Sequence, residues 1–67
     1  MVNPLETKIK KVIDHSTTFM EELLQASNSE TSEDFIEHIS SATYENELIY
    51  DILGSTMRVV EEMRNDD

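Results

Sequence analysis

The chain has 67 residues with one Gly, one Pro and no Cys, and its 15 acidic residues against five basic ones give a formal net charge of −10. A domain this small buries only a modest core, and without cysteine it has no disulfide to reinforce that core. We therefore expect one domain, residues 1–67, that gains stability from a partner protein or from self-association. The negative charge repels phosphate backbones and argues against direct binding to nucleic acid.

The N-terminal residues do not resemble an export signal. Charges at Glu6, Lys8, Lys10 and Lys11 interrupt any apolar run there, whereas a signal peptide has a continuous apolar stretch. No stretch of the sequence is long and apolar enough to cross a bilayer. We expect a cytoplasmic protein without membrane insertion.

A first helix is predicted over residues 4–26. Asn3, Pro4 and Glu6 provide a cap, a proline at the first helical position and a variant of the capping box. The helical spacing of the apolar residues that follow predicts one apolar stripe, formed by Leu5, Ile9, Val12, Ile13, Phe19, Met20, Leu23 and Leu24. The polar segment 27–31 ends it.

A second, longer helix is predicted over residues 32–64, with Thr31 or Ser32 as its cap. Its apolar residues keep an alternating spacing of four and three, typical of a helix packed along another helix: Phe35, Ile39, Ala42, Asn46, Ile49, Leu53, Met57, Val60 and Met63 or Arg64. Low helix propensity at residues 40–43 leaves a three-helix bundle with a break near 41–44 as an alternative. The predicted fold is an all-α antiparallel two-helix hairpin.

The two predicted helices differ in length, about 34 Å against about 50 Å at 1.5 Å per residue. In an antiparallel hairpin the first helix then reaches back only to about Leu53, and the apolar residues beyond it need cover from another molecule. The predicted partner-binding residues are Ile49, Ile52, Leu53, Met57, Val60 and Met63. The predicted hairpin core is Ile9, Val12, Phe19, Leu23, Phe35 and Ile39.

Charged residues of the two helices are expected to lie side by side. Lys8, Lys10 and Lys11 would lie alongside Glu45, Glu47 and Asp51 of the returning helix. Exposed pairs of this kind contribute only about 0 to 1 kcal/mol each and affect orientation more than stability.

Residue patterns of known catalytic and metal sites are missing. His15 and His38 have no second ligand at helical spacing and are expected at the surface or boundary. The run Asp14-His15-Ser16 cannot form a hydrolytic triad, because neighbours on a helix point in different directions. We expect no enzyme activity, no catalytic residues, no cofactor and no metal.

The sequence resembles the small E-subunit co-chaperones of type III secretion systems, the YscE, PscE, SsaE and EscE group. Phe35 is followed by Tyr44-Glu45 and then by the aliphatic run Leu48-Ile49-Tyr50-Asp51-Ile52-Leu53, and Leu5-Glu6-Thr7 is similar to the Leu-Glu near the N-terminus of that family. The resemblance implies a cytoplasmic subunit that binds a larger helical-repeat co-chaperone. It also implies that the pair keeps the needle subunit unpolymerised until export.

Two other functions fit the composition. The charge of −10 is compatible with an acidic DNA mimic that inhibits a DNA-binding protein, whose binding would weaken steeply with salt. An apolar face wider than one neighbouring helix can bury is also compatible with self-association into a four-helix structure.

Overall fold

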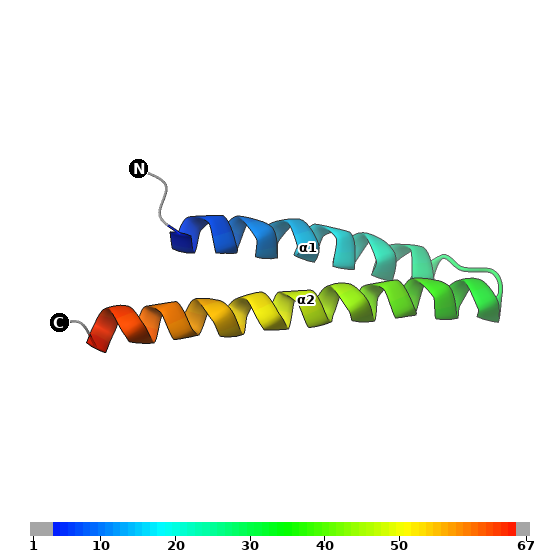
Figure 1. Cartoon of the computed structure of the whole chain (residues 1–67). Coiled ribbons are helices and arrows are strands. Elements are labelled where there is room, and N and C mark those ends of the chain that lie inside the picture. The colour runs from blue at the N-terminus through cyan, green and yellow to red at the C-terminus, as the bar shows by residue number, and fades with distance from the viewer. Residues whose placement is uncertain (1–3, 66–67) are drawn as a thin grey trace.

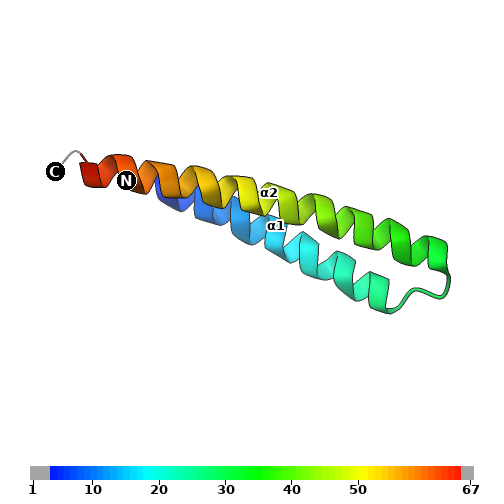
Figure 2. The same cartoon turned by 90° about the horizontal axis from the view of Figure 1, so that it is seen from below.

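The computed structural model describes residues 4–65, which form two helices joined by a short loop. Helix α1 spans Pro4–Ser27 and helix α2 spans Ser32–Asn65. The helices lie side by side and antiparallel (Figures 1 and 2), in a molecule that measures 55 × 21 × 11 Å. The predicted all-α hairpin is confirmed. Helix α2 passes through residues 41–44 without a break, so the three-helix alternative is wrong.

Local hydrogen bonds fix the ends of both helices at the loop. The backbone N–H of Asn28 donates to the carbonyl of Leu24 at 3.2 Å and closes the last turn of α1. At the start of α2, the backbone N–H of Asp34 donates to Oγ1 of Thr31 at 3.1 Å, which identifies Thr31 as the N-cap. The predicted cap at Asn3 lies outside the described residues.

The helices face each other along one row of side chains on each helix, which we call the seam. Its positions alternate in spacing between three and four residues, as in an antiparallel coiled coil, and every one of them is buried or half-buried. On α1 the seam is Leu5, Lys8, Val12, His15, Phe19, Glu22 and Ala26; on α2 it is His38, Ala42, Glu45, Ile49, Ile52, Thr56 and Val59.

Among the described residues, the buried side chains are two alanines, Ala26 at 4% exposure and Ala42 at 2%. Val12, Phe19 and Ile39 of the predicted core are half-buried, as expected. Ile9, Leu23 and Phe35 are exposed instead, at 42%, 39% and 48%, so their assignment to the core was wrong. Ile9 and Leu23 lie one position past the seam of α1, and Phe35 lies in the first turn of α2, where the cover from α1 ends (Figure 1).

Polar side chains interrupt the seam at regular intervals and bond across it. Nζ of Lys8 donates to Oγ of Ser55 at 2.7 Å. Nδ1 of His15 lies 2.6 Å from Oε2 of Glu45, and Nδ1 of His38 lies 2.8 Å from Oε2 of Glu22. Because a carboxylate only accepts, each histidine carries its hydrogen on Nδ1. These three bonds set the register, since a slip of either helix would leave half-buried polar groups unpaired.

The predicted pairing of the lysines with Glu45, Glu47 and Asp51 is wrong. Within residues 4–65, the carboxylates that bond across the helices do so with the two histidines, Glu45 with His15 and Glu22 with His38. Glu45 bonds to His15, and Lys8 reaches the hydroxyl of Ser55. The histidines themselves occupy the boundary position that was expected for them, half-buried between the helices.

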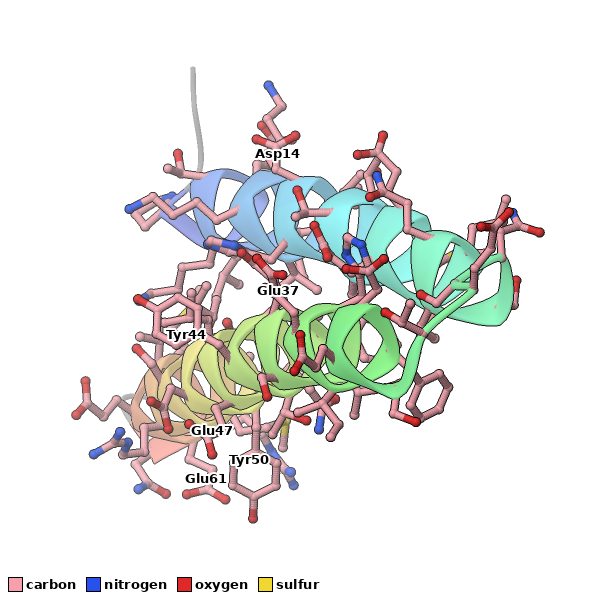
Figure 3. The ribbon with its side chains drawn as sticks, turned by 90° about the vertical axis from the view of Figure 1, so that its right-hand side faces the viewer. Asp14, Glu37, Tyr44, Glu47, Tyr50 and Glu61 are labelled. Atoms are coloured by element: carbon pink, nitrogen blue, oxygen red, sulfur yellow. The ribbon has the colours of Figure 1, made fainter. Side chains whose placement is uncertain are left out.

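The bond between His15 and Glu45 is expected to couple their contributions to stability. In a double-mutant cycle with His15→Ala and Glu45→Ala, we expect a coupling of about 0.5 to 1.5 kcal/mol in the free energy of unfolding, measured with urea. The control is the cycle Asp14→Ala with Glu47→Ala, whose side chains point away from the opposite helix (Figure 3) and should be additive. Additivity at His15 and Glu45 would contradict the assigned register.

The register also shortens the predicted overhang of α2. Leu5 near the start of α1 shares a shallow surface hollow with Val60, Met63 and Arg64, so α1 reaches about two turns beyond Leu53. The prediction that Val60 and Met63 have no intramolecular neighbour is therefore wrong. The reason is that residues 28–31 separate the helices, so the residues of α2 that face α1 lie further towards the C-terminus than a tighter turn would place them. Cover is still incomplete, because Met57 and Met63 remain 56% and 53% exposed.

Candidate functional site

The hairpin has two unlike sides, which follow from the positions next to the seam. A residue one position after a seam residue is turned by about 100° around its helix axis. In an antiparallel pair this rotation brings such residues of both helices to the same side. The residues one position before the seam lie together on the opposite side.

The side formed by the positions before the seam is polar. Thr18 of α1 and Ser41 and Tyr44 of α2 occupy such positions, and they line one shallow hollow together with Glu22, Ser40 and Glu45. The hollow confirms that these positions of both helices meet. Figure 3 shows Tyr44 at one side of the helix pair, with Asp14 pointing away from α2 and with Glu47, Tyr50 and Glu61 pointing away from α1.

The side formed by the positions after the seam is largely apolar. We call it the apolar side, and it comprises Ile9, Ile13, Met20 and Leu23 of α1 with Ile39, Leu53, Met57 and Val60 of α2. Six of these side chains are exposed by 39% to 63%. Exposed apolar surface that is continuous across two helices is typical of a protein-binding surface.

Polar residues divide the apolar side into two patches. Ser16, Thr43 and Asn46 occupy its middle. Towards the chain ends lies the terminal patch, which consists of Ile9, Ile13, Leu53, Met57, Val60 and the neighbouring Met63. Towards the loop lies a smaller patch, which consists of Met20 and Leu23 of α1 and Ile39 of α2. Outside the apolar side as defined, Leu24, Phe35 and Ile36 are also exposed, at 62%, 48% and 62%.

The predicted partner-binding residues fall into two groups. Leu53, Met57 and Met63 are exposed by 43%, 56% and 53%, and Val60 is half-buried beside them; all four belong to the terminal patch. Ile49 and Ile52 are half-buried seam residues, so they serve the hairpin itself. Their contact with a partner stays a prediction.

Sequence reasoning missed the α1 half of the surface. Ile13, Met20 and Leu24 are 57%, 63% and 62% exposed, although they belong to the predicted inward stripe. The signal was present in the width of that stripe, since Val12-Ile13, Phe19-Met20 and Leu23-Leu24 are adjacent pairs. One helix cannot present both members of such a pair to one neighbour.

Two other kinds of site are absent from the part of the chain that the structure describes. Residues 4–65 contain no group of three or more His, Asp or Glu side chains arranged to hold a metal ion. Neither α1 nor α2 has a segment apolar enough over a sufficient length to span a membrane.

Comparison with known proteins gave no relatives: no family model matches the chain, and no curated protein or solved structure shows significant similarity to it.

Proposed function

We propose that the chain is a non-catalytic protein-interaction module whose terminal patch is covered by a partner protein. The observation that carries the proposal is the contrast between the core and the surface. The buried residues within 4–65 are two alanines, while Ile13, Met57 and Met63 are more than half exposed. Full burial of one such side chain contributes about 1.5 to 3 kcal/mol, a large fraction of the stability of a domain this small.

Gly54 is a second reason to expect that another chain approaches α2 near the terminal patch. It lies inside α2 next to Leu53, and a Cβ added there would meet no atom within 4 Å. A glycine inside a helix costs about 1 kcal/mol relative to alanine, and nothing within the hairpin requires one at this position. A glycine does allow the backbone of another chain to approach closely.

The partner that fits best is the one implied by the resemblance to the type III secretion E-subunits. In this proposal a larger helical-repeat co-chaperone in the cytoplasm receives α2 in an apolar groove, a common way of binding an amphipathic helix. The pair then keeps the needle subunit from polymerising. Leu53, Met57, Val60 and Met63 form the contact on this chain.

Co-expression with the genes adjacent to its own tests this function. We expect the tagged chain to copurify with a helical-repeat protein in a complex that survives 1 M salt, where charge interactions are screened within about 3 Å, because apolar contacts hold it. The needle subunit should stay soluble only when both are present. A chain that remains an unbound monomer and unfolds cooperatively in this setting would overturn the proposal. A complex that dissociates at high salt would favour the acidic DNA mimic instead.

A further inference from the structure

All sulfur atoms of this chain belong to methionine thioethers. The sequence has four methionines and no cysteine, so methionine is the residue through which mild oxidants act on sulfur here. Three of the methionines lie in the described part of the chain, and their side chains are exposed to solvent: Met20 by 63%, Met57 by 56% and Met63 by 53%. An oxidant in solution therefore reaches all three in the free chain.

Met57 and Met63 lie in the terminal patch, one on each side of Val60 in the sequence. The spacing of three residues makes Val60 a neighbour of both methionines on the surface of α2. Val60 and Met63 line one shallow hollow with Leu5, and Met57 belongs to the apolar side together with Leu53. Two of the four side chains proposed to contact the partner are thus exposed thioethers.

Oxidation of these two side chains would leave the contacts between the helices in place. Met57 lies one position past the seam residue Thr56, and Met63 lies beyond the last seam residue, Val59. The three hydrogen bonds that set the register are made by other residues. A sulfoxide is polar where the thioether was apolar, so oxidation changes the surface of the terminal patch more than it changes the hairpin.

We propose that Met57 and Met63 form an oxidation-sensitive switch, in which a hydroperoxide converts both to the sulfoxide and the oxidised patch no longer binds the partner. In each reaction the Sδ lone pair attacks one peroxide oxygen, and the S–O bond forms as the O–O bond breaks. The proton of the transferred oxygen moves to the departing hydroxide, so sulfur loses two electrons and hydrogen peroxide is reduced to water. Methionine sulfoxide reductases reverse the change. The inference rests on the proposed function, since it requires the partner to contact the terminal patch.

Treatment of the free chain with hydrogen peroxide, which is removed before the copurified partner is added, tests the switch. We expect mass spectrometry to show one added oxygen at each of Met57 and Met63, and circular dichroism to show an intact hairpin. The affinity for the partner, measured by calorimetric titration, should fall at least about tenfold. In the preformed complex these two methionines should oxidise at least about tenfold more slowly, while Met20 oxidises at an unchanged rate.

Two leucine variants assign the effect. Met57→Leu with Met63→Leu keeps apolar side chains of similar volume without sulfur, and it should bind the partner equally before and after peroxide. Met20→Leu keeps both methionines of the terminal patch and should lose binding after peroxide, as the original chain does.

The outcomes separate the switch from the proposed function. If the double leucine variant still loses the partner on oxidation, or if the oxidised original chain binds normally or loses its helical structure, the switch alone is wrong. If the unoxidised chain captures no partner, the proposed function is wrong and the switch is wrong with it.

Discussion

The double substitution Leu53→Asp with Met57→Asp is expected to abolish the partner complex, with affinity reduced by at least about 100-fold. Both side chains are exposed in the free hairpin, at 43% and 56%, and neither belongs to the seam. In the complex each aspartate would place an unpaired charge against an apolar surface, a cost of several kcal/mol. Calorimetric titration with the copurified partner measures the loss, and circular dichroism checks that the hairpin persists.

The matched control places the same charges on the polar side. Ser40→Asp with Tyr44→Asp has the same spacing of four on the same helix, and both residues are exposed. This variant should bind the partner normally. If it loses binding while the Leu53 and Met57 variant keeps it, the partner contacts the polar side and the proposed surface is wrong.

Replacing Ala42 by Leu is expected to open the hairpin. Ala42 is 2% exposed and Ala26 is 4% exposed, so the helices approach closely where only methyl groups separate them. A larger side chain at such a position typically costs about 1 to 3 kcal/mol. Because the rest of the seam is only half-buried, a loss of that size would leave much of the protein unfolded at 25 °C. Urea unfolding followed by circular dichroism gives the change in free energy.

Ser40→Leu is the control for this substitution. Ser40 is exposed on α2 two residues before Ala42, so leucine there should leave the hairpin intact or stabilise it slightly through its higher helix propensity. An Ala42→Leu variant that is as stable as the original chain would show that the helices are further apart than the structure has them.

Helix boundaries were predictable from the sequence, because they depend on local signals. The polar segment 27–31 and the cap at Thr31 placed the loop, and the predicted ranges 4–26 and 32–64 differ from α1 and α2 by one residue at their C-terminal ends. The continuity of α2 through residues 41–44 followed from a spacing that keeps its phase and from the absence of Gly and Pro there.

The sequence did not predict the rotation of each helix about its axis, which decides which residues face the other helix. Counting apolar residues selected Ile39, Leu53 and Met57 as the inward row of α2, whereas the structure turns His38, Ile52 and Thr56 inward. The seam carries polar side chains that pair only with residues far away in the chain, such as Glu22 with His38 and His15 with Glu45. Such pairing becomes visible only when both helices and their register are known.

The division of the surface follows from that rotation. Once the seam lies on Val12, Phe19 and Ile52, the adjacent Ile13, Met20 and Leu53 are left on one exposed side. The sequence predicted that α2 has more apolar surface than the hairpin can bury. Both the length of α2 and the width of its apolar face were reasons for that prediction, and in the structure Leu53 and Met57 are exposed beside the seam.

The most direct test of this account is the solvent accessibility of the methionine methyl groups in the free chain and in the copurified complex, measured by NMR with a soluble gadolinium reagent. We expect strong relaxation of the Met57 and Met63 methyl groups in the free chain. In the complex this relaxation should be lost, while the Met20 methyl group should remain accessible. Met57 and Met63 that relax equally in both states would contradict this account.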